Sequence, residues 1–210
     1  MIPWYLITLD DEPWKLPQTL KHLAEHGIVP KVIHGINGYL AGLRPSTPFA
    51  VEKNGDLSYI HPAQLGCALS HIIALTVALS DGAEQFIIAE DDVLLGDDFN
   101  EKFDALVKAL PEDAQIFQMQ YPSASGQYNP LAGGDLWECT NAFGTACILW
   151  KREAAKQALL MLRPIDSPFD IMLIRKVYPF MKHFISDPPL VHERTSSGEW
   201  PSSFQNKTKD

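Results

Sequence analysis

The chain has 210 residues, of which 46% are hydrophobic and 20% are charged, as in ordinary globular domains that bury a substantial core. Its formal net charge of -9 argues against a nucleic-acid backbone or an anionic membrane surface as the main partner, but it does not exclude an acidic substrate bridged by a metal ion. No apolar run approaches about 20 residues and no signal peptide is evident, so we expect a cytoplasmic protein without a transmembrane segment that touches a membrane at most peripherally. Cys67, Cys139 and Cys147 lack metal-type spacing, and we expect them to be small buried hydrophobic residues.

The N-terminal part of the chain has the pattern that opens an α/β sheet. The apolar run from Trp4 to Leu9 predicts a strand, and a helix is expected from about Pro17 to His26, closed by Gly27. Residues 30–34 offer a second strand, and the order strand, helix, strand is typical of α/β folds. Residues 35–59 show no clear period and predict an irregular loop of a length that is often functional.

The middle of the chain contains the strongest helix prediction, from Pro62 to Ala83, with proline in the first turn and Gly82 at the end. A strand from Phe86 to Ala89 follows. Further elements are predicted in this order: a helix capped at Asp97 or Asp98 and ending at Leu110, a strand over 116–119, an irregular stretch over 120–135, a strand over 144–150, a helix over 152–162 and a short helix after Asp170.

Three consecutive carboxylates, Glu90, Asp91 and Asp92, close the apolar strand in the middle of the chain. Carboxylate oxygens are hard ligands suited to Mg²⁺ or Mn²⁺, and such an ion can neutralise a diphosphate in an adjacent crevice. The alternative is a solvated acidic turn that caps the next helix.

Four segments in order along the chain resemble the signature of one family. They are 61–71, with Gly66-Cys67-x-x-Ser70-His71; 88–93, with the acidic triplet; 143–150 followed by two alanines; and 164–170. Together they resemble glycosyltransferase family 25, which includes bacterial lipooligosaccharide galactosyltransferases and the galactosyltransferase domains that modify collagen. Two positions depart from the family pattern: the arginine expected after the first strand is missing near Lys15, and Gln64 replaces a glutamate.

The resemblance implies an α/β fold of the nucleotide-sugar-binding, GT-A-like type, with a mixed, largely parallel sheet flanked by helices. We expect one glycosyltransferase domain over residues 1–195 and a polar, frayed tail over 196–210. In such folds an acidic motif at a strand end holds Mn²⁺ or Mg²⁺, here through Glu90 and Asp92, which alternate along an extended segment and so face the same way. A late histidine often completes the site, which makes His192 the third candidate ligand; its alternative is an ordinary surface or core histidine.

The resemblance also implies donor contacts, for which the candidates are Thr8, Asp10, Ser70, His71 and Asp91. Ser70 and His71 share a helix face with Cys67, so the alternative for them is close packing and one structural hydrogen bond. A carboxylate must accept the proton of the attacking hydroxyl, and Asp170 fits that role best, with Asp166 second; helix capping is the alternative for both.

The expected function is an inverting, metal-dependent transfer of a hexose from a UDP-sugar to a saccharide acceptor such as a lipooligosaccharide core. Galactose is the expected sugar because the family mostly uses it. A catalytically silent family member that binds a nucleotide sugar or glycan without transfer is the alternative. A metal-dependent phosphoesterase would need more histidine and aspartate ligands than the sequence offers.

Overall fold

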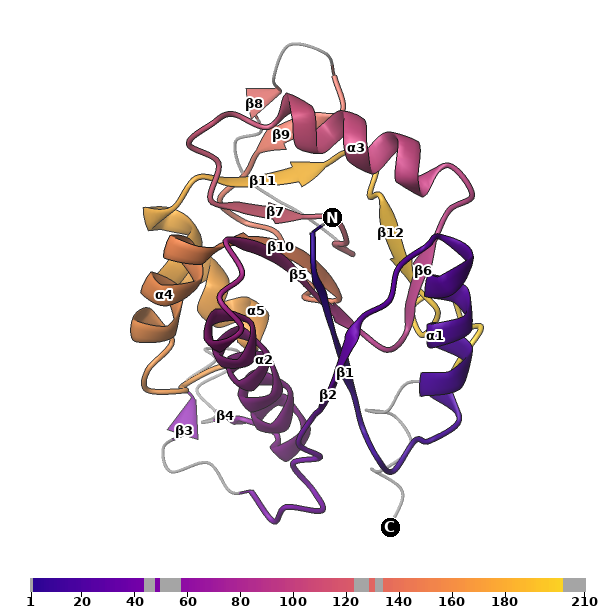
Figure 1. Ribbon diagram of the computed structural model, residues 1–210. Coiled ribbons are helices and arrows are strands. Elements are labelled where there is room, and N and C mark those ends of the chain that lie inside the picture. Colours follow the sequence, from indigo (N-terminus) through magenta and orange to yellow (C-terminus); the bar gives the residue numbers. More distant parts are fainter. Residues whose placement is uncertain (1, 44–47, 50–57, 123–128, 131–133, 202–210) are drawn as a thin grey trace.

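The computed structural model describes residues 2–43, 48–49, 58–122, 129–130 and 134–201. Within them, a mixed sheet of eight strands forms the centre of the protein, in the order β2-β1-β5-β10-β7-β11-β9-β8. β10 and β9 run opposite to the other strands of this sheet. The observed sheet with helices on both faces confirms the predicted α/β class and its largely parallel sheet (Figure 1).

The strands of the described residues are β1 (Trp4–Thr8), β2 (Lys31–His34), β3 (Pro48–Phe49), β4 (Ser58–Tyr59), β5 (Gln85–Glu90), β6 (Val93–Leu95), β7 (Ile116–Gln118), β8 (Asn129–Pro130), β9 (Leu136–Glu138), β10 (Cys147–Lys151), β11 (His183–Ser186) and β12 (Val191–Glu193). The helices are α1 (Lys15–Glu25), α2 (Pro62–Ser80), α3 (Phe99–Ala109), α4 (Arg152–Met161) and α5 (Phe169–Met172), the last continued by the π-helical and 3₁₀ turns η1 (Leu173–Val177) and η2 (Tyr178–Phe180).

The two central strands alternate between two hydrophobic cores, as the period of two in a strand requires. One core lies under α2, α4 and α5 and receives Tyr5, Ile7, Phe86 and Ile88. The other lies under α1 and α3 and receives Trp4, Leu6, Ile87 and Ala89. Because positions 86 and 88 face α2, the alternation also turns the next even-numbered side chain, Glu90, toward that helix.

Every strand and helix predicted along the chain is present, with shifted ends. α1 begins two residues earlier than expected, at Lys15, which places this lysine in the first helical turn. Asp98 is the N-cap residue of α3, but its side chain pairs with Lys102 and makes no capping hydrogen bond. Seven short strands among the described residues were not predicted, because runs of two to four residues carry too little periodicity to be recognised; they are β3, β4, β6, β8, β9, β11 and β12. The irregular stretches 35–59 and 120–135 lie partly outside the described residues.

The prediction that no apolar stretch approaches membrane-spanning length was wrong. α2 has 19 residues, and among the described helices it alone is long and apolar enough to cross a membrane, judged by length and composition only. It packs on β1, β2 and β5 and also contacts α4 and α5. A core helix between a sheet and other helices needs apolar residues around most of its circumference, and this position accounts for the composition of α2.

Beyond the expected domain end at 195, the chain packs on the rest of the protein through Trp200, whereas residues 196–199 and 201 are exposed. Trp200 is 7% exposed, and its ring lies edge-on to Trp14 at 5.0 Å between centroids. The guanidinium of Arg194 lies 5.0 Å from the same ring. Residues 202–210 of the expected tail lie outside the described residues. The packed segment reaches back to the start of α1 and so closes one side of the region described next.

Candidate functional site

A cavity of about 210 Å³ lies where β1 and β5 end side by side. The two strands are parallel, with Ile7 opposite Glu90, so their carboxyl ends meet at the same edge of the sheet. Ligands of open α/β sheets bind at such edges. The cavity is smaller than the roughly 300–1,000 Å³ of typical small-molecule sites. Its lining residues are Ile7, Thr8, Leu9, Glu12, Lys15, Ile36, Ala63, Cys67, Ser70, His71, Glu90, Asp91, Asp92, Glu193 and Thr195.

Glu90 faces α2 and is held by two side chains. The imidazole Nε2 of His71 lies 3.1 Å from its Oε1, and the hydroxyl of Thr145 donates to the same oxygen at 2.7 Å. Burial alone would raise the pKa of Glu90, but the contact with His71 and the hydrogen bond from Thr145 bring it below the usual value. The His71 ring is itself fixed, because it stacks on Phe169 with centroids 4.5 Å apart.

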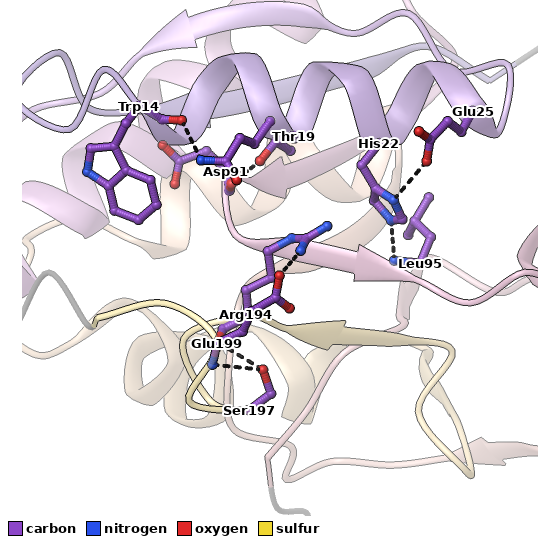
Figure 2. A network of polar contacts seen from close by, with 10 residues as sticks. Trp14, Thr19, His22, Glu25, Asp91, Leu95, Arg194, Ser197 and Glu199 are labelled. Carbon is purple, nitrogen blue, oxygen red and sulfur yellow. Dashed lines mark hydrogen bonds and ion pairs between the residues drawn. The ribbon is translucent and has the colours of Figure 1, made fainter.

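Asp91 and Asp92 lie in the turn between β5 and β6, so the expected strand alternation stops at Glu90. The Thr8 hydroxyl donates to Asp91 Oδ2 at 2.6 Å. Figure 2 shows the Thr19 hydroxyl of α1, which donates to the Asp91 carbonyl. The Thr195 hydroxyl donates to Asp92 Oδ2. The turn is thus attached to β1, to α1 and to the C-terminal segment, and all three carboxylates of the triplet line the cavity.

Among the three carboxylates of the triplet, the buried charge of Asp92 is balanced least by hydrogen bonds. Its Oδ1 is buried and has no hydrogen-bond partner among the described residues. Burial raises the pKa of Asp92 from 3.8 to about 7, the charge of Glu90 adds to the rise, and the Thr195 hydrogen bond opposes it. Burial likewise raises the pKa of Asp91 to about 6. A buried carboxylate oxygen without a donor is costly, and a bound cation would remove that cost.

The cavity carries an excess of negative charge. Besides the triplet, Glu12 and Glu193 line it, and burial raises the pKa of Glu193. Lys15 supplies the one permanent positive charge among the described lining residues; it is 2% exposed and its Nζ lies 2.8 Å from Glu12 Oε2. Five carboxylates around one lysine, with an unsatisfied oxygen on Asp92, fit a hard divalent cation.

Ser70 fixes α2 against the loop that follows β2. Its hydroxyl accepts from the Ile36 amide at 2.8 Å and donates to the Gly66 carbonyl at 2.7 Å. Gln64 completes a capping box with His61, which a glutamate would complete equally well. The departure from the family pattern at position 64 therefore preserves the local structure.

Several predicted site residues lie elsewhere. Asp10 is exposed and its carboxylate lies 2.6 Å from His34 Nδ1. Asp166 pairs with Lys176 at 2.7 Å, away from the cavity lining. Asp170 follows Phe169 on α5, so it adjoins the wall that holds His71, but it is not a lining residue.

His192 is exposed and lines a different cavity, with Asp98 and Lys102. Its neighbour Glu193 and the next odd-numbered residue, Thr195, line the acidic cavity instead. Sequence reasoning chose the histidine because of its chemistry, whereas the alternation of β12 turns the glutamate inward. The register of this short strand, with His192 opposite Leu94, was the missing information.

Three potential metal ligands of different chemistry meet on the α2 side of the cavity. One ligand atom each of Cys67, His71 and Glu90 lies within 4.8 Å of the others. The sequence placed the first two on one helix face, but it did not show which strand end they would meet.

The unfolding free energy of the metal-free Asp92→Asn protein, relative to the wild type, is expected to increase as the pH rises from about 4 to about 7. The Asp92 carboxyl binds its proton more tightly in the folded state, so the wild-type protein loses stability as the pH rises from about 4 to about 7. Asparagine does not titrate, so the variant does not show this loss. The comparison is needed because His183, whose pKa burial lowers to about 3, contributes the opposite slope in both proteins. Urea unfolding at several pH values in EDTA measures the difference, which should reach a few kcal/mol. If the difference in unfolding free energy between the two proteins did not change with pH, the raised pKa of Asp92 would be contradicted.

Comparison with known proteins gives a family match and several similar solved structures of low sequence identity. The family model of glycosyltransferase family 25 (LPS biosynthesis protein) matches residues 1–130, which leaves the late motif with Asp170 outside the match. No curated protein matches the sequence. A similar solved structure is that of a protein from STIV, with 14% identity, coverage of 88% of this chain and 81% of that chain, and a TM-score of 0.47. A glycosyltransferase involved in the glycosylation of the major capsid of PBCV-1 has 11% identity, coverage of 91% of this chain and 82% of that chain, and a TM-score of 0.47. Mannose-1-phosphate geranyltransferase from Thermus thermophilus has 13% identity, coverage of 89% of this chain and 74% of that chain, and a TM-score of 0.44. Since the family model matches more than half of the chain, including the acidic triplet and the Gly66 to His71 motif, the protein belongs to glycosyltransferase family 25.

Proposed function

We propose that the protein transfers a hexose from a UDP-sugar to a saccharide acceptor, with inversion at the anomeric carbon. The observation that carries this proposal is the acidic cavity at the carboxyl ends of β1 and β5, where Asp92 presents a buried oxygen without a partner among the described residues. Family membership supports the reaction class, and the description of the family as LPS biosynthesis proteins supports a lipopolysaccharide or lipooligosaccharide core as acceptor. UDP-galactose is the donor to test first.

Glu90, Asp92 and Glu193 are the residues that would hold Mn²⁺ or Mg²⁺, with Glu193 in the position for which the sequence suggested His192. When bound, such an ion neutralises the negative charge that develops on the diphosphate leaving group. The residues of the chain fix the carboxylates in advance, since Thr145 holds Glu90 and Thr195 holds Asp92. Asp91 already accepts a hydrogen bond from Thr8, so its role would be to hold the turn in place or to contact the ribose.

Asp170 is the proposed base that takes the proton from the acceptor hydroxyl. One oxygen of its carboxylate accepts from the Ile171 amide at 2.8 Å, and among the described residues no other hydrogen bond to this carboxylate competes with a substrate. Asp166 is the weaker candidate, because its ion pair with Lys176 and its contact with Ser167 lower its pKa despite partial burial. A carboxylate with a lowered pKa is a poorer proton acceptor.

Replacing Lys15 by methionine is expected to weaken UDP binding about 10- to 100-fold, the range for losing a charge-assisted hydrogen bond. Lys15 stands near the position where the family has an arginine, and its buried ammonium is the permanent positive charge on the described wall of the cavity. Calorimetric titration with UDP and Mn²⁺ measures the effect. Lys15→Arg should retain most of the affinity, and Lys21→Met, which removes an exposed lysine from the same helix, should bind normally. Equal UDP affinity of Lys15→Met and Lys21→Met would contradict a role in diphosphate binding.

The test of the function is UDP release from a panel of UDP-sugars, with Mn²⁺ or EDTA, and with or without oligosaccharides of a lipooligosaccharide core. We expect release that requires both the ion and an acceptor. Chemical analysis of the product then identifies the sugar and whether the anomeric configuration is inverted. Release that is unaffected by EDTA would contradict the proposed use of the ion.

A catalytically silent member of the family is the second candidate, favoured by the location of Asp170 and Asp166 outside the cavity lining. Such a protein would bind a UDP-sugar or glycan and release no UDP with any acceptor. Two results together would favour the silent member. Saturating UDP would stabilise the protein against heat only in the presence of Mn²⁺, and no UDP would be released from any donor.

A further inference from the structure

Cys67 and His71 lie one turn apart on α2 and face Glu90 at the end of β5. One ligand atom from each residue lies within 4.8 Å of the other two, and His71 Nε2 lies 3.1 Å from Glu90 Oε1. Cys67 is half-buried and lines the cavity, so an ion that enters the cavity reaches its thiol. The three side chains thus offer sulfur, nitrogen and oxygen at one point.

These separations are close to those of a tetrahedral zinc site. With bonds of about 2.0 Å to nitrogen and oxygen, tetrahedral geometry places those two ligands about 3.3 Å apart, and a sulfur at about 2.3 Å lies about 3.5 Å from each. The observed separation of 3.1 Å between His71 and Glu90 already matches. All three ligand atoms lie within 4.8 Å of one another, so none has to approach another by more than about 1.3 Å, and rotation of the Cys67 side chain moves its sulfur.

The surroundings hold two of the ligands in place. Thr145 donates to Glu90, and Phe169 stacks on the imidazole of His71. Outer contacts of this kind fix the orientation of metal ligands and strengthen binding. Burial, followed by the charges of Glu90, Asp170 and Asp92, raises the pKa of the Cys67 thiol, and a cation beside the sulfur would offset those charges. Thiolate and imidazole select Zn²⁺ over Mg²⁺ or Mn²⁺, which prefer oxygen ligands.

We propose that Cys67, His71 and Glu90 bind Zn²⁺, with the fourth position open to the cavity. On binding, a zinc–sulfur bond forms as the S–H bond of Cys67 breaks, and the thiol proton passes to the buffer. His71 coordinates through Nε2 as neutral imidazole, so an imidazole that starts out protonated releases a second proton. Cys67 thereby has a role beyond the small buried hydrophobe that the sequence suggested.

Glu90 is common to this site and to the proposed Mn²⁺ or Mg²⁺ site with Asp92 and Glu193. Occupation by Zn²⁺ is therefore expected to weaken Mn²⁺ binding. The zinc site itself does not depend on the proposed function; only this competition does. A protein that binds Zn²⁺ but never Mn²⁺ would contradict the metal-dependent transfer and leave the zinc site intact.

The test is calorimetric titration of the reduced, metal-free protein with Zn²⁺ in two buffers of different ionisation enthalpy, which gives the affinity and the number of protons released. We expect one ion per chain. Cys67→Ser should bind at least tenfold more weakly and release about one proton fewer per ion. Cys139→Ser is the matched control, since Cys139 is buried away from the cavity, and it should bind like the wild type.

Titration of the unmodified protein with Co²⁺ makes the result independent of any variant. A bound Co²⁺ with a thiolate ligand shows a sulfur-to-metal charge-transfer absorption, and excess Zn²⁺ should remove it. Absence of that absorption, or equal Zn²⁺ affinity and proton release in Cys67→Ser and the wild type, would overturn the zinc site. Mn²⁺ affinity that is the same with and without one equivalent of Zn²⁺ would overturn the shared role of Glu90.

Discussion

Replacing Asp92 by asparagine is expected to lower metal-dependent UDP release at least 100-fold while leaving the metal-free protein at least as stable as the wild type at neutral pH. The loss follows from removing a charged ligand of the proposed ion, whose stabilisation of the leaving group is worth several kcal/mol, or about tenfold in rate for each 1.4 kcal/mol. Stability does not fall because Asp92 Oδ1 is buried without a partner in the described structure, so its charge costs energy until a cation binds.

Initial rates of UDP release over a range of Mn²⁺ concentrations measure the first effect, and urea unfolding in EDTA measures the second. Asp97→Asn makes the same change of charge at an exposed position outside the cavity lining, and both quantities should stay near those of the wild type. If Asp92→Asn released UDP within threefold of the wild-type rate, Asp92 would not be a metal ligand. If it unfolded more easily than the wild type at neutral pH, the carboxylate would have a structural role that we have not identified.

Replacing Gly66 by alanine is expected to destabilise the protein by about 1–3 kcal/mol, the usual cost of overpacking, and to weaken UDP binding at the same time. A Cβ at this position would lie 2.4 Å from the Ile36 carbonyl oxygen and 2.7 Å from the Gly38 amide nitrogen. Both are backbone atoms, so relief requires α2 to move away from the loop after β2. Alanine favours a helix over glycine by about 1 kcal/mol, which is too little to offset such an overlap. The same movement would shift His71 and Ile36, which line the cavity.

Thermal unfolding and titration with UDP check this prediction. For a protein of this size we expect a fall in melting temperature of roughly 2–4 °C for each kcal/mol. Gly96→Ala is the control, because its Cβ would meet only the flexible side chain of Asp98 at 3.3 Å, and we expect a change within about 0.5 kcal/mol. A Gly66→Ala protein as stable as Gly96→Ala would show that the close contact between α2 and the loop is not needed.

The sequence was sufficient to single out the acidic triplet as a candidate site, because two local signals coincided there. The apolar run before Glu90 required a buried strand, and strand ends of α/β sheets meet at one edge. The helix from Pro62 had an unambiguous length and a proline start, so Ser70 and His71 could be placed on one face. The structure brings this face to Glu90 and to the end of β1, where Thr8 lies.

Other residues at the site are brought there by contacts between distant segments of the chain. Lys15 precedes the predicted start of its helix, and its burial depends on contacts with Glu12 and the triplet across the sheet edge. Thr145 lies in the predicted strand over 144–150, but only the pairing of β10 with β5 brings its hydroxyl to Glu90. Thr195 joins the site because the C-terminal segment folds back on Asp92 and on Trp14 through Trp200, a contact made over more than 100 residues of chain.

The α/β class, the order of the main elements and the four segments that resemble the family can be read from the sequence, since hydrophobic period and strand-end carboxylates are local properties. Tertiary structure alone decided which side chains share the cavity: it turned Glu193 inward and His192 outward through the register of a three-residue strand, and it left Asp166 in an ion pair with Lys176. It also brought Cys67 and His71 of α2 within 4.8 Å of Glu90. Register and long-range packing are collective properties of the folded chain, because a shift of one residue reverses every side chain of a strand while leaving its composition unchanged.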